Sequence, residues 1–105
     1  MDEKEKEMTL QKMQMIEQNL QNLLLQKQAF NMELTETKSA KGQVEKSGEE
    51  VFKLIGQILI KTEAKPVLED LSNKEKLIEL RLKTMEKQES DLSEKLQKLQ
   101  KEVLG

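Results

Sequence analysis

Apolar residues recur along two long stretches of the chain at alternating steps of three and four, which is the spacing of a heptad repeat. In the first stretch the stripe runs through Met13, Ile16, Leu20, Leu23, Lys27, Phe30, Leu34, Thr37, Lys41 and Val44, of which Lys27, Thr37 and Lys41 are polar. In the second stretch it runs through Leu71, Glu75, Ile78, Leu82, Met85, Glu89, Leu92, Leu96, Leu99 and Val103, of which Glu75 and Glu89 are polar. Such a stripe makes two helices wrap around each other, so the pattern predicts a coiled coil of helices 8–47 and 65–103.

The residues between these stretches favour β-structure, because Val, Ile and Phe replace the helix-favouring Glu and Gln. We expect strands over about 51–54 and 57–61, within a β-hairpin spanning 51–62. Both strand faces are largely apolar, and a lone two-stranded hairpin is marginal in water, so we expect other chains to cover it. The candidate oligomerisation residues are Val51, Phe52, Leu54, Ile55, Gly56, Ile58, Leu59 and Ile60.

Glycine and proline mark the helix boundaries. Gly48 can take the positive φ that ends a helix, and Pro66 is tolerated in the first turn of the next one. Two helices of nearly equal length joined by a short bend should fold back antiparallel. The predicted fold class is therefore mainly α: one domain over residues 1–105, a long antiparallel two-helix coiled coil joined by a β-hairpin.

Charged residues interrupt both stripes, and they suggest a register. The residue numbers of Lys27 and Glu89 have the same sum as those of Lys41 and Glu75. An antiparallel pair of helices keeps such sums constant, so each lysine should lie diagonally opposite its glutamate. Exposed pairs of this kind contribute at most about 1 kcal/mol, so their expected role is to set the register.

Composition argues against catalysis and against several binding roles. The chain has no cysteine and no histidine, and it has no glycine-rich phosphate loop; we therefore predict no enzyme activity, no metal and no cofactor. The net charge is −2 with both signs interspersed, which predicts no nucleic-acid partner.

No apolar run approaches the roughly twenty residues of a membrane span. The charged N-terminus lacks the apolar core of a signal peptide, so we expect a cytoplasmic protein.

Apolar residues beyond the stripes gather where the two chain ends should meet. The candidate binding residues there are Met8, Leu10, Met13, Met15, Leu99, Val103 and Leu104. Flexible methionines suit surfaces that accept many partners, so this end is a candidate binding site for unfolded proteins. The alternative for Met13, Leu99 and Val103 is that they only complete the helix contact.

The run from Val51 to Lys61 resembles the hairpin signature of archaeal-type prefoldin β subunits. Gln26-Lys27-Gln28, the segment 33–37 and the segment 85–89 resemble that family at matching places along the chain. The resemblance covers nearly everything from Leu10 to Val103. Gly42 departs from the helix-favouring residues common there, which leaves the helix boundary near the bend open.

The resemblance implies an ATP-independent chaperone. It implies a heterohexamer of two α-type and four β-type subunits, in which the hairpins form a β-barrel base and the coiled-coil tips hold unfolded clients for a group II chaperonin. A second hypothesis is a structural coiled-coil adaptor or scaffold with one specific folded partner. The doubly apolar hairpin separates the two hypotheses, because an adaptor needs only a polar loop at the bend.

Overall fold

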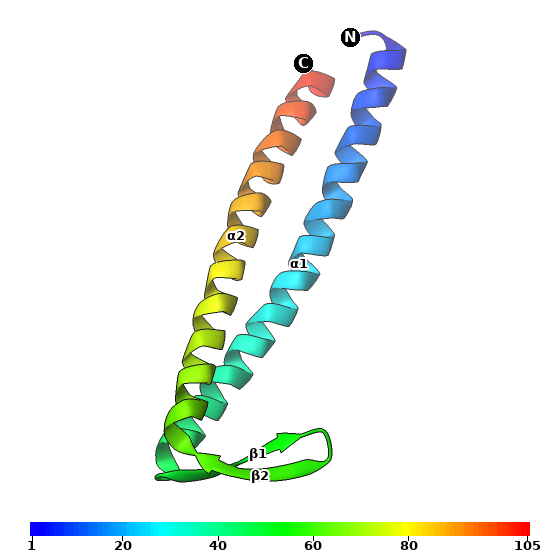
Figure 1. Cartoon of the computed structure of the whole chain (residues 1–105). Coiled ribbons are helices and arrows are strands. Elements are labelled where there is room, and N and C mark those ends of the chain that lie inside the picture. Colours follow the sequence, from blue (N-terminus) through cyan, green and yellow to red (C-terminus); the bar gives the residue numbers. More distant parts are fainter. The chain divides into compact units, whose positions relative to one another are not determined.

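The computed structural model describes residues 1–105 and contains two helices and two strands (Figure 1). Helix α1 spans Glu3–Lys46, strand β1 spans Glu50–Ile55, strand β2 spans Ile58–Glu63, and helix α2 spans Ala64–Leu104. The order helix, hairpin, helix is the predicted one. Helix α1 begins five residues before the predicted start at residue 8, and each strand extends beyond its predicted range.

The early start of α1 has a local cause. The side-chain oxygen Oδ1 of Asp2 accepts a hydrogen bond of 2.8 Å from the backbone N–H of Glu5. Aspartate in this capping position satisfies a donor that the first helical turn leaves free, and the acidic Glu3 and Glu5 in that turn interact favourably with the helix dipole. The charged N-terminal segment is therefore helical from Glu3 onward.

Helix α1 ends at the predicted glycine. The helix continues through Gly42 to Lys46, and Gly48 then adopts a φ of 91°, which only glycine takes without strain. The backbone N–H of Ala64 donates a 2.8 Å hydrogen bond to the carbonyl of Glu49. This bond closes the base of the hairpin where α2 begins, and Pro66 lies in the first turn of α2 as predicted.

The two strands pair antiparallel around a two-residue turn, Gly56-Gln57, because Ile55 and Ile58 are direct partners. Gly56 has a φ of 61° and no other residue of the turn has a positive φ, which is the pattern of a type II′ turn. Gln57, which the sequence placed at the start of the second strand, lies in this turn instead. Glycine at the first position of a two-residue turn, as Gly56 is here, favours a type II′ turn.

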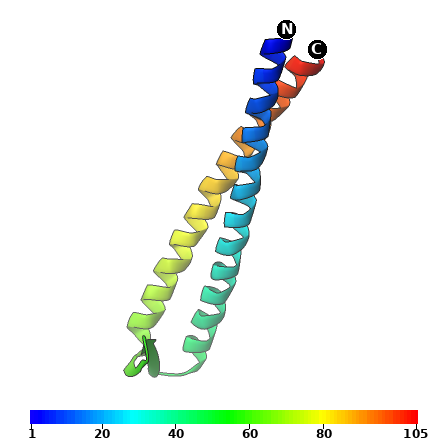
Figure 2. The same cartoon turned by 90° about the vertical axis from the view of Figure 1, so that its right-hand side faces the viewer.

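The chain divides into two compact units, each of which contains a segment of both helices. One unit consists of Met1–Ala29 and Leu82–Gly105, and the other of Phe30–Arg81, which includes the hairpin. We call them the terminal unit and the hairpin unit. Within each unit the two helix segments run side by side in opposite directions (Figure 1, Figure 2). Met1 and Gly105 lie at the same end of the terminal unit.

The predicted stripes form the contact between the helices in each unit. Every residue of both stripes is buried or half-buried, whereas most of their neighbours are exposed. Among them Ile16, Ile78, Leu82 and Met85 are the most buried apolar side chains. This burial confirms the antiparallel coiled coil.

Two threonines belong to the same buried contact. Thr37 is 3% exposed and Thr9 is 9% exposed. Their hydroxyl groups donate to the backbone carbonyls of Glu33 and Glu5, at 2.7 and 2.8 Å. Thr9 stands four residues before Met13, so it continues the heptad stripe, but it lies beyond the end of the stripe assigned from the sequence.

Candidate functional site

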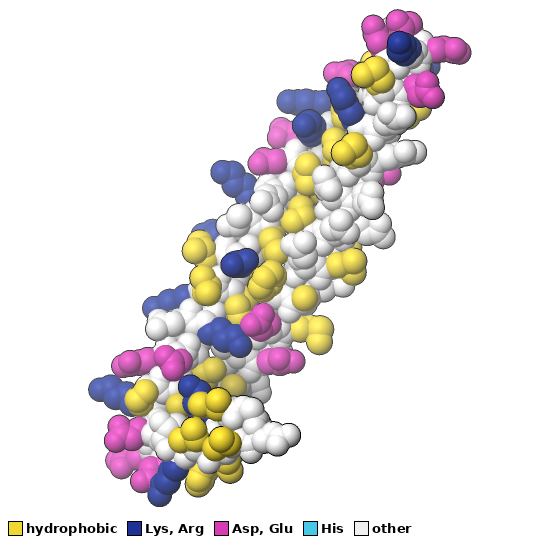
Figure 3. Space-filling model, turned by 45° about the vertical axis from the view of Figure 1, so that its right-hand side comes forward, with side chains coloured by type: hydrophobic (Ala, Val, Ile, Leu, Met, Phe, Trp, Pro, Cys, Tyr) yellow, Lys and Arg dark blue, Asp and Glu magenta, His cyan; other side chains and the backbone are white.

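The hairpin carries a large exposed apolar surface. Six side chains of the two strands are between 44% and 67% exposed. We call this set the hairpin surface: Phe52, Leu54, Ile55, Ile58, Leu59 and Ile60. Only Val51, at 9% exposed, is buried within its own chain. In the space-filling view, hydrophobic side chains gather on the hairpin (Figure 3). Exposed apolar area of this density on a short hairpin is typical of a protein–protein interface.

Both faces of the hairpin contribute to this surface. Residues directly opposite each other in an antiparallel pair point to the same side. Leu54 and Leu59 are partners, and Phe52 shares their face. Ile55, Ile58 and Ile60 lie on the other face, with Val51. Lys61 and Glu50 form an ion pair of 2.8 Å near the base of the hairpin. This pair lies on the same face as Leu54 and Leu59.

The edges of the hairpin are open as well. The sheet contains only β1 and β2, so each strand has one edge with backbone N–H and C=O groups that no other strand of this chain pairs. Open edges beside apolar faces are the features through which strands of separate chains join. The candidate oligomerisation residues thus lie in one element, with Gly56 at the turn, and all of them are exposed except Val51, which is buried at the base and offers other subunits little surface.

Near the chain ends the structure separates the candidate binding residues into two groups. Met8, Leu10, Met15 and Leu104 are exposed, with values from 45% to 87%. We call these four the terminal patch. Met13, Leu99 and Val103 are half-buried in the helix contact, as expected if they complete the heptad stripes. They therefore offer a partner less surface than the sequence analysis assigned to them.

The terminal patch lies on both sides of the helix contact. Met8 and Met15 are seven residues apart, which places them on nearly the same face of α1. Leu10 follows Met8 by two residues and therefore faces the opposite flank of the helix. The patch thus presents apolar groups in two directions, and the methionines occupy one of them.

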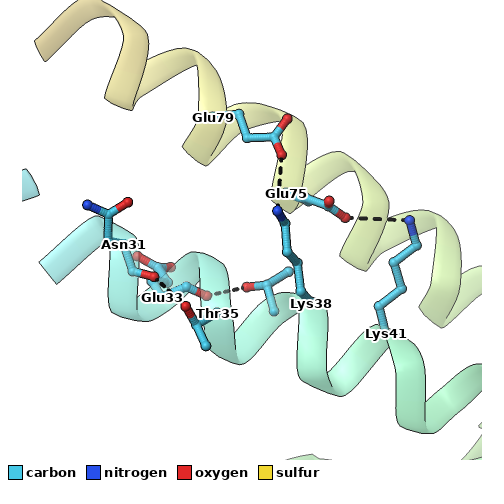
Figure 4. Close-up of polar contacts among 8 residues, drawn as sticks. Asn31, Glu33, Thr35, Lys38, Lys41, Glu75 and Glu79 are labelled. Carbon is cyan, nitrogen blue, oxygen red and sulfur yellow. Dashed lines mark hydrogen bonds and ion pairs between the residues drawn. The ribbon is translucent and has the colours of Figure 1, made fainter. Parts of the chain in front are cut away.

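The two predicted Lys–Glu pairs are in contact. Lys27 Nζ lies 3.4 Å from Glu89 Oε2 in the terminal unit. Lys41 Nζ lies 3.4 Å from Glu75 Oε2 in the hairpin unit (Figure 4). All four residues are half-buried. The structure brings these residues together; their register-setting role remains a prediction.

The hairpin unit contains further polar contacts that sequence analysis did not identify. Lys38 lies 3.9 Å from Glu79, and Lys74 lies 3.4 Å from Glu33. These four side chains are about half exposed, so each pair adds little stability. The alignment of the helices that brings Lys41 to Glu75 also brings Lys38 to Glu79. The second pair could therefore have been predicted from the first.

Prediction for the register pair: replacing both Lys27 and Glu89 with leucine should raise the melting temperature, because apolar side chains fit a half-buried helix contact better than an ion pair. The same change should allow more than one alignment of the helices, because a polar contact that favours one register is lost. The chain has no cysteine, so pairs of introduced cysteines can report alignment by disulfide cross-linking.

The matched control for this test is the exposed pair Lys38 and Glu79. Replacing both of these with leucine should leave a single alignment. A single alignment in the Lys27→Leu/Glu89→Leu variant as well would contradict the register-setting role.

Comparison with known proteins identifies the family. The prefoldin subunit family matches residues 7–104. The prefoldin subunit beta of Thermococcus onnurineus is 38% identical over 89 residues, covering 83% of this chain and 77% of the relative. That of Pyrobaculum calidifontis is 38% identical over 86 residues, covering 80% and 69%. The chain belongs to the prefoldin family and is of the β-subunit type.

A solved structure agrees with this assignment. The crystal structure of the prefoldin beta subunit from Thermococcus strain KS-1 has a TM-score of 0.87 with this chain at 32% identity. The match covers 94% of this chain and 89% of that one. The resemblance read from the hairpin sequence is therefore confirmed, together with the fold.

Membership of the family carries a general role. Prefoldin subunits are chaperone components rather than enzymes, and they assemble with other prefoldin subunits into hetero-oligomers. Nowhere do three potential metal ligands gather in this chain. Neither helix combines the length and the apolar character that crossing a membrane requires.

Proposed function

We propose that this prefoldin subunit is part of an ATP-independent holdase that binds unfolded proteins in the cytoplasm and delivers them to a group II chaperonin. In this proposal two α-type and four β-type subunits join through their hairpins into a β-barrel base. The terminal patches of several subunits then grip one client together. No folded partner of one fixed shape is required, because each contact is small and apolar.

The observation that carries the assembly step is the hairpin surface. Its six side chains are exposed on both faces of a two-stranded sheet with open edges. Removing apolar surface from water stabilises a complex by about 25 cal/mol per Å². In a chain on its own the hairpin surface stays in water, so this stabilisation is not gained. Pairing the edges with strands of other subunits would satisfy the backbone groups and cover the apolar side chains at once.

The client-binding step is supported by the exposure and chemistry of the terminal patch. Met8, Leu10, Met15 and Leu104 are apolar, exposed and free of a packing role in the helix contact. One such patch binds weakly, but several held on one base bind an unfolded chain with greatly increased avidity, often by about a hundredfold or more. Methionine adapts to side chains of different shape, which suits a varied set of clients.

The second candidate function, an adaptor for one folded protein, is less well supported. An adaptor needs a coiled coil and a specific surface, but it has no use for a bend that is apolar on both faces. It would bind one partner at fixed stoichiometry and would not protect unrelated unfolded proteins.

Prediction for the terminal patch: replacing Met8, Leu10, Met15 and Leu104 together with serine or glutamine should weaken suppression of client aggregation. The complex with an α-type subunit should still form, because none of the four residues lies in the hairpin. The measurement is light scattering of an unfolded client at increasing ratios of complex, with assembly checked by gel filtration.

The matched control replaces Leu24 and Leu25, which are 50% and 60% exposed on the same helix, with glutamine. This control should protect clients as well as the original complex does. If the patch variant protects equally well, clients bind elsewhere and the assignment of the terminal patch is wrong.

A further inference from the structure

The methionines of this chain differ sharply in exposure. The sequence contains six of them and no cysteine, so methionine is its only oxidisable sulfur. Met8 and Met15 are 54% and 66% exposed, whereas Met85 in the helix contact is 8% exposed. Met13 is half-buried. An oxidant in solution therefore reaches the sulfurs of Met8 and Met15, as it reaches those of Met1 and Met32, which are 57% and 65% exposed, whereas Met85 in the helix contact is protected.

From this distribution we propose that Met8 and Met15 form an oxidation switch: their conversion to methionine sulfoxide turns off client binding by the terminal patch and leaves the fold intact. This inference rests on the proposed function and adds a means of regulating it. The oxidant class is a peroxide, and the reverse reaction belongs to methionine sulfoxide reductases.

The chemistry is balanced with hydrogen peroxide as the second reactant. The thioether sulfur attacks one peroxide oxygen, an S–O bond forms, and the O–O bond breaks. The departing hydroxide takes the proton from the oxygen now bound to sulfur, which leaves the sulfoxide and one molecule of water. Sulfur loses two electrons and the peroxide gains them, so no further reductant or metal is needed.

The effect on binding follows from the change in polarity. A sulfoxide replaces a flexible apolar side chain with a polar and chiral one, which disrupts methionine-rich contacts. Met8 and Met15 share one face of α1, so two oxidations alter the same flank of the patch. The loss is repeated on each subunit that grips the client, and avidity multiplies these small losses.

The fold should tolerate these two oxidations. Both sulfurs lie outside the heptad stripe, so a sulfoxide there can remain hydrated. Neither residue is within the hairpin surface, so assembly does not depend on them. The switch therefore acts on binding alone, which separates it from oxidative unfolding.

The test uses the complex of this chain with its α-type subunit. The complex is treated with hydrogen peroxide until peptide mass spectrometry finds sulfoxide at Met8 and Met15. Suppression of client aggregation is measured before treatment, after treatment, and after the two sulfoxide reductases have acted. We expect the concentration of complex needed for half suppression to rise at least about threefold on oxidation and to return after reduction.

Two variants make the test specific. Met8→Leu/Met15→Leu keeps the patch apolar and cannot be oxidised there, so it should suppress aggregation before and after treatment. Met32→Leu removes a methionine that is 65% exposed in the hairpin unit, and this variant should lose suppression as the original complex does. Circular dichroism and gel filtration should be unchanged throughout.

Two results would overturn the switch. One is full suppression by a complex that carries sulfoxide at both positions. The other is an equal loss of suppression in the Met8→Leu/Met15→Leu variant, which would place the sensitive residue elsewhere. Failure of the untreated complex to suppress aggregation is a different result, since it rejects the proposed function before any oxidant is added.

Discussion

Replacing Ile58 and Ile60 with glutamate should leave a helical chain that no longer enters large assemblies. The two side chains are 65% and 44% exposed on one face of the hairpin, where a neighbouring subunit is proposed to cover them. Burying an unpaired carboxylate costs several kcal/mol, so two of them should weaken association by about a thousandfold or more. Gel filtration with an α-type subunit measures the loss of assembly.

The helices should persist in this variant, because their contact is made by the heptad stripes and not by the hairpin. Far-ultraviolet circular dichroism should therefore change little. The matched control is Gln97→Glu/Gln100→Glu, which adds the same two charges at exposed positions of α2. Assembly should survive in the control. Persistent large oligomers in the Ile58→Glu/Ile60→Glu variant would refute the role of the hairpin in assembly.

Replacing Ile78 with alanine should cause a large loss of stability. Ile78 is 4% exposed, the lowest value among the apolar residues of the chain. Truncating a buried isoleucine to alanine costs about 2–5 kcal/mol. For a chain of this size each kcal/mol corresponds to roughly 4–8 °C, so the melting temperature should fall by about 10 °C or more. Alanine is the better helix former, so the loss would come from packing alone.

Leu77 provides the matched control for this prediction. It precedes Ile78 on the same helix but is 58% exposed. Leu77→Ala should lower the melting temperature by only a few degrees, because little contact is lost. Thermal unfolding followed by circular dichroism compares the two variants. Equal melting temperatures would mean that the heptad stripe does not provide the main stabilising contact of the hairpin unit.

The coiled coil could be predicted because its signal is periodic and its residues are mostly apolar. Every position assigned to the two stripes is buried or half-buried, including the polar Lys27 and Glu75. Thr9 was missed because it lies beyond the first apolar residue of the stripe, whereas Thr37 was found because Leu34 and Val44 stand on either side of it at stripe spacing. In both threonines the hydroxyl donates to the backbone carbonyl four residues earlier, a partner that becomes available only once the helix has formed.

The helix ends and the turn were harder to place, because they depend on single residues. Asp2 caps α1 through one hydrogen bond, and a charged segment alone does not reveal this. Gln57 was assigned to the second strand because a turn at Ile55-Gly56 and a turn at Gly56-Gln57 differ only by one residue. The structure pairs Ile55 with Ile58 and so places the turn at Gly56-Gln57.

The terminal patch could be predicted only in part. Composition identified the apolar residues near the chain ends, and the heptad stripe offered the helix contact as the alternative for Met13, Leu99 and Val103. The stripe places Met13 in the contact, and the structure leaves Met15 exposed two residues later. The sequence of this chain alone does not specify what binds the exposed residues, because the surface of a binding partner belongs to another molecule.

The charged residues within the helix contact also bear on how the chain is made. During translation α1 emerges well before α2, and neighbouring ribosomes on one message expose several copies of α1 at the same time. If two of these paired in parallel, Lys27 would meet Lys27 and Lys41 would meet Lys41, and the like charges would repel each other in a partly dehydrated environment. The lysines of a newly made α1 thus disfavour its pairing with α1 of another chain. They find oppositely charged partners once α2 of the same chain supplies its glutamates.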